Sequence, residues 1–424
     1  MAAGQRVAIV GAGQAAARTV AALRQAGYEG GIALIGNEDA LPYERPPLSK
    51  EALFGAGDPA PATFFDRAFY AAQGVDLLLG ETASAIDATS GAVQLASGTR
   101  LQADRVVLAT GARARPLALP GVAADRVLSL RSFADACQLR TRLAPGLRLV
   151  LVGGGFIGLE IAAGAARMGC QVTVVEARPR LLERAVSPQL SEIVHARHAA
   201  GGVAVRLGCA ITGARAGHGE TELLLSDGGR CVADLVVAGI GALPNDALAV
   251  AAGLDCGNGV VVDAHCRTRA PRIWAVGDVA ARHHPSWGQR VRIESWDNAE
   301  LQGGIAGRAI AASWHDAGAL PPLEAEAPAW FWTDQYELNL QILGDATGAD
   351  QTVVRADPRN GSTVLLHWRG GVLRGAELVG AAREKPFARK LVQAGWPLAP
   401  ELLGDMGMTL KELWSAAQRS AAAA

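Results

Sequence analysis

Near its start the chain reads Val7-Ala8-Ile9-Val10-Gly11-Ala12-Gly13-Gln14-Ala15-Ala16, an apolar run followed by a glycine-rich turn. About 140 residues later the plan returns as Leu149-Val150-Leu151-Val152-Gly153-Gly154-Gly155-Phe156-Ile157-Gly158. In such a turn the first glycine permits the tight bend, the second lets the backbone approach a pyrophosphate, and the third position, Ala16 or Gly158, must be small. A single turn of this kind is equally typical of an ordinary strand-to-helix connection. Two in the same order, each before a run of helix-forming residues, predict two bound dinucleotides.

An acidic residue follows each predicted unit, about 20 residues after the glycines, where a ribose hydroxyl needs an acceptor. Glu176 comes directly after the apolar run Val172 to Val175. After the first unit the acceptor is ambiguous, because Asn37 and Glu38 both follow the apolar run Ile32 to Ile35. We take Glu38 as the nearer candidate and keep Asn37 beside it.

The order of strand and helix signals predicts an α/β fold with two Rossmann-like dinucleotide-binding domains, one inserted in the other. The first domain comprises residues 1–114 and 242–320, and the inserted domain comprises 115–241. We join 242–320 to the first domain because the apolar run Ile273 to Val276 reads as a buried strand that needs a sheet. Alternating apolar and polar residues after 320 predict a third, α+β domain over 321–424. The strands expected in the two parallel sheets lie near 6–10, 32–35, 75–79, 105–109, 148–152, 171–175, 203–207 and 235–238.

Composition excludes several classes of protein. Half of the 424 residues are hydrophobic, 19% are charged and the net charge is −1, so nothing indicates nucleic-acid binding. No apolar run of membrane-spanning length and no signal peptide is present, so we expect a cytoplasmic protein away from membranes, as a monomer or a homodimer. The six cysteines never form C-x-x-C. Electrons would therefore be handled by a cofactor and not by thiols.

Lysine is rare in this chain, which uses arginine almost everywhere. Its 40 basic residues include only Lys50, Lys385, Lys390 and Lys411. Lys50 therefore stands alone in the first 384 residues, which indicates a position that needs a compact ammonium instead of a planar guanidinium. Pro46 and Pro47 predict an extended entry to a helix whose first turn holds Lys50. The alternative for Lys50 is an ordinary surface lysine.

The residues around Lys50 carry a resemblance to a known family. Leu41-Pro42-Tyr43-Glu44-Arg45-Pro46-Pro47-Leu48-Ser49-Lys50 is similar to a segment of NADH:ferredoxin reductases of the putidaredoxin reductase and aromatic-dioxygenase reductase type. Further matching segments follow in the family's order over essentially the whole chain. They are Ala109-Thr110-Gly111, Gly153 to Glu160, Ala275 to Asp278, Arg292 to Trp296, and Trp330 to Glu337.

The resemblance implies a glutathione-reductase-like fold with FAD in the first domain, NADH in the second and a ferredoxin docking near the third. It implies that Lys50 lies near the flavin N5 edge and pairs with Glu160, placed on the first turn of the second glycine-loop helix. We expect this pair to be catalytic, orienting flavin and nicotinamide for direct hydride transfer from NADH to FAD.

A set of cofactor-binding residues follows from the glycine loops and the resemblance together. It comprises Gly11, Gly13, Ala15, Ala16, Asn37, Glu38, Arg45, Lys50, Ala83, Thr110, Gly111, Arg131, Asp278, Glu294, Trp296, Trp332, Gly153, Gly155, Phe156, Ile157, Gly158, Glu160, Glu176, Arg184 and Gly241. Three of these have ordinary structural alternatives. Asp278 could cap a helix, Arg131 could be a surface arginine, and Trp332 could belong to the core.

Coenzyme choice depends on Glu176, because a carboxylate there accepts from the 2′-hydroxyl of NADH and repels the 2′-phosphate of NADPH. Arg178, Arg180 and Arg184 follow closely and could favour the phosphate instead. We expect NADH, since the acid lies at the strand end and the arginines lie beyond it.

The sequence therefore predicts an FAD-dependent NAD(P)H:ferredoxin oxidoreductase that prefers NADH. With no cysteine motif for a cluster of its own, its acceptor would be a separate [2Fe–2S] ferredoxin serving a cytochrome P450 or a Rieske-type oxygenase. The alternatives are a reductase of rubredoxin or oxygen, and an NADH-sensing interaction protein like apoptosis-inducing factor. We expect no metal site, although Glu192, His195 and His198 recur at helical spacing.

Overall fold

The computed structural model describes residues 4–217, 219–285, 287–315, 320–323, 327–359, 361–395 and 407–422. Contacts divide the chain into two compact units, which are described separately. The first unit comprises residues 1–45, 60–113 and 242–326, and the second comprises 46–59, 114–241 and 327–424. Residues 46–59, which include Lys50, thus associate with the second unit and not with the residues just before them.

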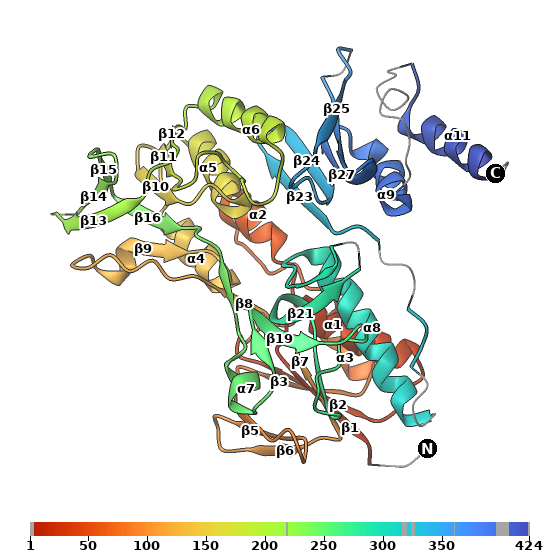
Figure 1. The fold of residues 1–424 in the computed structure, drawn as a ribbon. Coiled ribbons are helices and arrows are strands. Elements are labelled where there is room, and N and C mark those ends of the chain that lie inside the picture. The colour runs from red at the N-terminus through yellow and green to blue at the C-terminus, as the bar shows by residue number, and fades with distance from the viewer. Residues whose placement is uncertain are drawn as a thin grey trace. The chain divides into compact units, whose positions relative to one another are not determined.

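The first unit is built on a five-stranded parallel sheet with strand order β20-β7-β1-β2-β3 (Figure 1). Its strands are β1 (Arg6–Val10), β2 (Gly31–Gly36), β3 (Val75–Leu79), β7 (Arg105–Leu108) and β20 (Ile273–Ala275). The strand expected near residue 273 pairs with β7, so it lies in the same sheet as the first glycine loop. All four strands predicted near the start of this unit are therefore confirmed.

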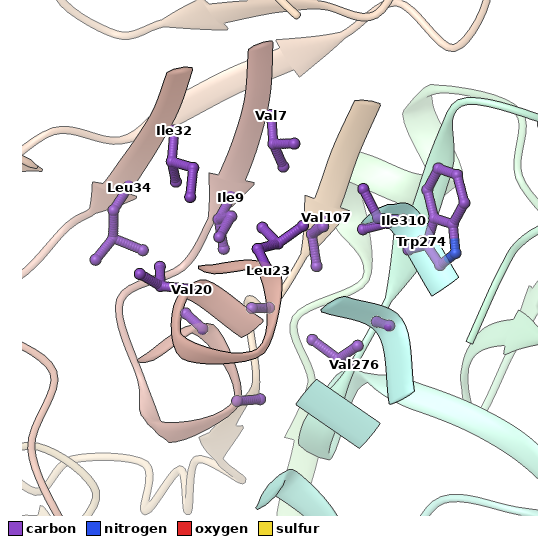
Figure 2. Packing of buried hydrophobic residues seen from close by; sticks show 14 of the residues in the cluster. Val7, Ile9, Val20, Leu23, Ile32, Leu34, Val107, Trp274, Val276 and Ile310 are labelled. Carbon is purple, nitrogen blue, oxygen red and sulfur yellow. The ribbon is translucent and has the colours of Figure 1, made fainter. Parts of the chain in front are cut away.

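One face of this sheet is covered by α1 (Gln14–Gln25) and α8 (Trp296–His315). Figure 2 shows Val7, Ile9, Ile32 and Leu34 of the sheet facing Val20 and Leu23 of α1, with Ile310 and Trp274 beside them. The two helices approach closely because α8 carries glycines at the contact. A Cβ atom on Gly303 would lie 2.6 Å from the carbonyl oxygen of Ala15, and one on Gly307 would lie 2.6 Å from the Cβ of Ala22.

Shorter elements complete the first unit. The turn at Ser97-Gly98 joins β5 (Ala92–Leu95) and β6 (Arg100–Gln102) of a small antiparallel sheet. The remaining elements are α3 (Arg67–Ala72), β4 (Ala83–Ile86), β5 (Ala92–Leu95), β6 (Arg100–Gln102), β17 (Ala242–Pro244), α7 (Ala247–Ala251), β18 (Cys256–Gly257), β19 (Gly259–Val262), η3 (Gly277–Val279), β21 (Ala280–His284) and β22 (Gln289–Val291).

The second unit repeats the parallel plan with strand order β12-β11-β10-β16-β9. Its strands are β9 (Val127–Ser129), β10 (Arg148–Val152), β11 (Gln171–Val175), β12 (Ala204–Arg206) and β16 (Leu235–Ala238). Around this sheet lie η1 (Pro46–Ser49), α2 (Glu51–Phe54), β8 (Ala112–Ala114), η2 (Ala124–Arg126), α4 (Phe133–Arg142), α5 (Phe156–Met168), α6 (Pro188–Ala200), β13 (Ile211–Ala216), β14 (Thr221–Leu225) and β15 (Arg230–Ala233). The strands predicted for the second nucleotide fold are all present.

The end of the chain forms an antiparallel sheet with strand order β23-β24-β27-β26-β25. Its elements are β23 (Trp330–Gln335), β24 (Leu338–Gly344), β25 (Gln351–Ala356), β26 (Thr363–Arg369), β27 (Val372–Val379), η4 (Ala382–Glu384), α9 (Lys385–Ala394) and α11 (Leu410–Ala422). Leu391 of α9 and Leu410 of α11 share a core with Leu366, Trp368 and Leu378 of the sheet. The α+β composition expected here is confirmed, and α11 is an addition that the sequence did not predict.

Within the described residues, no helix has both the length and the apolar character needed to cross a membrane.

Candidate functional site

The first glycine loop is tight on one side and open on the other. Gly11 has φ +110°, and a Cβ there would lie 2.1 Å from the carbonyl oxygen of Ala109 at the end of β7. Gly13 is different, because nothing lies within 4 Å of where its Cβ would be. Ala15 and Ala16 are buried where α1 enters the core. Gly11 is therefore needed for chain packing, whereas Gly13 leaves room beside the backbone.

The second loop has the same construction. Gly153 has φ +104°, and a Cβ there would lie 2.4 Å from the carbonyl oxygen of Gly239. A Cβ on Gly158 would lie 2.7 Å from the carbonyl oxygen of Gly153, which explains why the third position must be small. Gly155 is the open position, since the nearest atom to its Cβ site is 3.9 Å away. Ile157, two residues later, is 43% exposed, which suits an apolar contact with a bound ligand.

The helices that begin at these loops have no side-chain cap. Gly13 is the N-cap of α1 and Gly155 is the N-cap of α5, and neither can supply a side-chain acceptor. By contrast, Asp66, Ser132 and Ser187 cap α3, α4 and α6 with their side chains. The first N–H groups of a helix need an acceptor and carry partial positive charge. Both loops therefore fit a diphosphate. The first N–H groups of each helix have no side-chain cap, and the glycine beside them leaves space for a ligand.

The candidate ribose acceptors of the two units have different hydrogen-bond partners. Glu38 accepts a hydrogen bond from the Tyr43 hydroxyl at 2.6 Å and forms an ion pair with Arg45 at 3.3 Å. Asn37 beside it is exposed. Glu176 accepts from the backbone N–H of Gly154 at 2.6 Å, which ties the end of β11 to the second loop. Glu38 is thus the more firmly oriented of the two candidates in the first unit.

The arginines after Glu176 are mostly occupied locally. Arg180 donates to the carbonyl oxygens of Val186 at 2.7 Å and Glu183 at 2.8 Å. Arg178 contacts the Glu183 carboxylate at 3.4 Å. The guanidinium of Arg184 lies 3.7 Å from the Cβ site of Gly241, which has φ +102°.

Thr110 and Gly111 are fixed by a residue that the sequence did not single out. The Thr110 hydroxyl donates to the carbonyl oxygen of Asn245 at 2.7 Å, and the Asn245 side chain donates to the carbonyl oxygen of Thr110 at 2.9 Å. The Asn245 N–H donates to Gly111 at 2.9 Å. Asn245 lies far along the chain with no motif around it, so only the fold brings it here.

Asp278 lies inside the short turn η3 and is not the cap of a helix, so that alternative is wrong. The turn is anchored by Gly277, whose N–H donates to the buried Gln302 at 2.8 Å and whose Cβ site is 2.9 Å from the Cβ of Ala15. The turn that carries Asp278 therefore lies against the first glycine helix. Arg292 donates to the Asp278 carbonyl oxygen and pairs with Glu294.

The remaining candidates vary in their surroundings. Ala83 is buried in a core cluster, so its side chain serves packing. Arg131 precedes the capping box of α4, where its N–H donates to Asp135 at 2.9 Å.

Trp296 is the half-buried first residue of α8, and Gln14 donates to its carbonyl oxygen at 3.0 Å. Trp332 is half-buried and stacks on Trp330 with ring centroids 4.9 Å apart, so it is not a fully buried core residue.

Lys50 differs from its prediction in one respect. The two prolines are taken up by the turn η1, and Lys50 is the N-cap of α2 instead of lying in a helical first turn. Glu160 is the fifth residue of α5, so it begins the second turn and not the first. The expected pairing is nevertheless present, with Lys50 Nζ 3.1 Å from Glu160 Oε1 and the carboxylate side chain only 7% exposed.

Two hydroxyl groups that the sequence did not identify complete the surroundings of Glu160. The Ser49 hydroxyl donates to Oε2, and the Thr333 hydroxyl donates to Oε1 at 2.7 Å. Ser49 and Thr333 are both buried. Both lie in segments that the sequence singled out, yet their pattern carries no sign of a shared partner.

The Lys50 segment is fixed on α5 by packing as well. A Cβ on Gly164 would lie 2.2 Å from the ring of Phe54, so this glycine makes room for α2. Arg140 of α4 donates to the carbonyl oxygens of Ala52, Gly55 and Gly57. These contacts hold the end of α2 and with it the position of Lys50.

Two dinucleotide loops on separate parallel sheets, together with a lysine paired with a buried glutamate, define an α/β oxidoreductase with a glutathione-reductase-like fold. Residues 5–303 match the family model "Pyridine nucleotide-disulphide oxidoreductase", and residues 330–414 match "Reductase C-terminal". The chain belongs to the pyridine nucleotide-disulphide oxidoreductase family. Membership implies binding of FAD and NAD(H). None of the six cysteines, all within the described residues, forms a disulfide.

Three relatives indicate the branch of the family. The ferredoxin–NAD(+) reductase component of the anthranilate 1,2-dioxygenase system of Burkholderia cepacia is 42% identical over 95% of this chain and 98% of that protein. Putidaredoxin reductase of Pseudomonas putida is 38% identical over 99% of both chains. The crystal structure of the covalent putidaredoxin reductase–putidaredoxin complex matches with a TM-score of 0.91 and 36% identity, over 98% of this chain and 100% of that chain.

Proposed function

We propose that this chain is an NADH-dependent ferredoxin reductase that serves a dioxygenase or cytochrome P450 system. The observation that carries the proposal is the pair between Lys50, which is partly exposed, and the buried carboxylate of Glu160 on the second glycine helix. It supports a catalytic site, because a buried carboxylate held against a lysine is costly to maintain for stability alone. The relatives support the same function, since they include a ferredoxin–NAD(+) reductase component and putidaredoxin reductase.

FAD would be held by residues of 1–114 and 242–320, around Gly11, Gly13 and Glu38. The bare start of α1 and the open side of Gly13 support a diphosphate there. When bound, FAD supplies the chemistry that accepts a hydride and releases electrons singly, which a nicotinamide cannot do alone. Asp278, Trp296 and the remaining candidates of this set are proposed contacts.

NADH would be held by residues 115–241, around Gly153, Gly155 and Glu176. Glu176 supports NADH over NADPH, because its carboxylate would repel a 2′-phosphate. Arg180 supports the same choice, since both of its contacts are with backbone carbonyls. Arg178, which is 56% exposed, and Arg184 are the cations of this segment that could meet a phosphate.

The electron acceptor would be a separate small [2Fe–2S] ferredoxin that docks near residues 321–424. The described cysteines form no cluster-binding group with other ligands, and the relatives include a reductase solved with putidaredoxin. We expect an acidic ferredoxin to meet arginines, so its reduction rate should fall as ionic strength rises. The downstream oxygenase would be served only through this carrier.

The test is turnover by the purified protein. We expect bound FAD that is reduced by NADH, and cytochrome c reduction that requires added [2Fe–2S] ferredoxin. Rapid oxygen consumption without a carrier would favour an oxidase, and transfer to rubredoxin alone would favour a rubredoxin reductase. An NADH-dependent change in oligomeric state without turnover would favour an interaction protein like apoptosis-inducing factor.

A further inference from the structure

A line of buried polar side chains leads away from Glu160 of α5 through β23 to α6. Thr333 Oγ1 lies 2.7 Å from Glu160 Oε1, and Gln335 Nε2 lies 3.1 Å from Thr333 Oγ1. Gln335 Oε1 lies 2.9 Å from His198 Nε2. Thr333, Gln335 and His198 are each 0% exposed. The members all lie within the second contact unit.

The strand geometry explains why Thr333 and Gln335 share this line. Side chains two residues apart on a strand point to the same face. Phe331 lies on that face as well and stacks on Phe156 of α5 with ring centroids 6.5 Å apart. Trp330 and Trp332 lie on the other face, stacked on one another. β23 thus presents its polar residues to α5 and α6 and its two tryptophans to the opposite side.

With Glu160 ionised, only one assignment of donors and acceptors is possible along this line of side chains. An ionised carboxylate only accepts, so the single hydroxyl hydrogen of Thr333 is directed at Glu160. The oxygen of Thr333 must then accept from the amide nitrogen of Gln335. The amide oxygen of Gln335 consequently faces His198, which must donate from Nε2. His198 therefore carries a proton on Nε2.

The surroundings of His198 agree with this assignment. Its Nδ1 is buried and has no hydrogen-bond partner among the described residues. Burial lowers the pKa of His198, the hydrogen bond to Gln335 opposes this, and Arg197 and His195 lower the pKa further. The ring is therefore kept neutral and serves as a fixed donor.

We propose that His198, Gln335, Thr333 and Ser49 are positioning residues that hold Glu160 in a single orientation for Lys50. Three donors of defined direction then converge on a nearly buried carboxylate: Ser49, Thr333 and Lys50. Aligned hydrogen bonds reinforce one another in a low-dielectric interior. The proposal rests on the proposed function for its effect on catalysis, although the hydrogen-bond line itself is independent of any cofactor.

The most direct variant is Thr333→Val, which removes the hydroxyl and keeps the shape. Its matched rescue is Thr333→Ser, which restores the hydroxyl. The control is Thr352→Val in the same sheet, because the Thr352 hydroxyl contacts His367 and has no part in this line. Gln335→Leu is the second variant, in case Thr333→Val fails to fold.

Two spectroscopic readouts follow the line without relying on turnover. With only four lysines, reductive methylation with ¹³C gives few signals, and Lys50→Met assigns that of Lys50. We expect Thr333→Val to move the Lys50 signal, and Thr333→Ser and Thr352→Val to leave it in place. Long-range ¹H–¹⁵N spectra should show His198 protonated at Nε2 in the wild type and altered in Gln335→Leu.

The kinetic readout is flavin reduction by NADH in stopped flow. We expect the rate of flavin reduction to fall roughly tenfold or more in Thr333→Val, because one charge-assisted hydrogen bond is lost. Thr333→Ser restores the hydroxyl and should recover the rate. An unmoved Lys50 signal and an unchanged rate in both Thr333→Val and Gln335→Leu would overturn the inference. If the wild type itself shows no flavin reduction, the proposed function fails while the spectra still test the line.

Discussion

Lys50 Nζ lies 3.1 Å from Glu160 Oε1, and the two residues are brought together by a turn before α2 and the second turn of α5. Their side chains are 19% and 7% exposed. Removing Lys50 would leave the buried Glu160 without this cation, and removing Glu160 would leave Lys50 with the more distant Asp334, at 4.0 Å. The relationship therefore makes each residue sensitive to substitution of its partner.

Lys50→Met should slow flavin reduction by NADH by roughly 10- to 100-fold, equivalent to losing about 1.4–2.7 kcal/mol of transition-state stabilisation. The reason is that Glu160 loses the cation that lies 3.1 Å from it. Stopped-flow bleaching of the flavin measures this. Lys411→Met, at an exposed position on α11, is the matched control and should reduce at the wild-type rate. Equal rates of flavin reduction in the wild type, Lys50→Met and Lys411→Met would count against a role for Lys50.

Glu176→Gln should shift coenzyme preference toward NADPH by about tenfold in the ratio of kcat/KM values. The amide oxygen can still accept from Gly154, so the loop should stay in place while the negative charge is lost. Steady-state kinetics with both coenzymes measure the ratio. A preference that stays the same would show that the charge of Glu176 does not set the choice.

Gly307→Ala and Gly304→Ala, one turn apart on α8, should act in opposite directions. A Cβ on Gly307 would lie 2.6 Å from the Cβ of Ala22 and 3.0 Å from the backbone of Leu23, so α1 and α8 must separate. A Cβ on Gly304 meets only arginine side-chain ends at 3.4 Å or more, and alanine favours a helix by about 0.5–1 kcal/mol.

Thermal unfolding compares these two variants. We expect Tm to fall by roughly 5 °C in Gly307→Ala, for an overpacking cost of about 2 kcal/mol, and to rise slightly in Gly304→Ala. Equal Tm values would mean that the close contact of the helices is not required.

His198 should make the protein less stable at mildly acidic pH. Burial holds its folded-state pKa below 6.5, the ordinary value for a histidine, so the unfolded chain binds the proton more readily. The stability is therefore fully present above pH 6.5 and is lost as the pH falls from there toward the folded-state pKa. The slope is at most about 1.4 kcal/mol per pH unit for one group.

His198→Gln keeps a donor near the Nε2 position and cannot take up the proton. Denaturant titrations at pH 7, 6 and 5 should therefore show a smaller loss of stability in this variant than in the wild type. Parallel pH profiles of the two proteins would contradict a buried, neutral His198.

The sequence predicted the parts of the fold that local pattern determines. The apolar runs before Gly11 and Gly153 are β1 and β10, and the carboxylate at Glu176 lies at the end of β11, as expected. The pairing of Lys50 with Glu160 came from the family resemblance. Whether the proposed cofactor contacts are used stays a prediction.

What the sequence missed depends on contacts between distant segments. Ser49, Thr333 and Asn245 are ordinary polar residues whose partners lie far away in the chain. Gly164 and Gly307 look like weak points of helices until Phe54 and Ala22 are seen against them. The sequence predicted Lys50 in the first turn of a helix, whereas Lys50 follows the turn η1 and is the N-cap of α2. Two successive prolines are compatible with either a helix start or a tighter turn.

The most direct test of the central claim is an anaerobic titration of the purified protein with NADH, followed by addition of [2Fe–2S] ferredoxin. We predict a yellow protein containing FAD, loss of flavin absorbance on addition of NADH, and its return as the ferredoxin is reduced. A colourless protein that takes up no FAD on reconstitution and shows no spectral response to NADH would contradict the account.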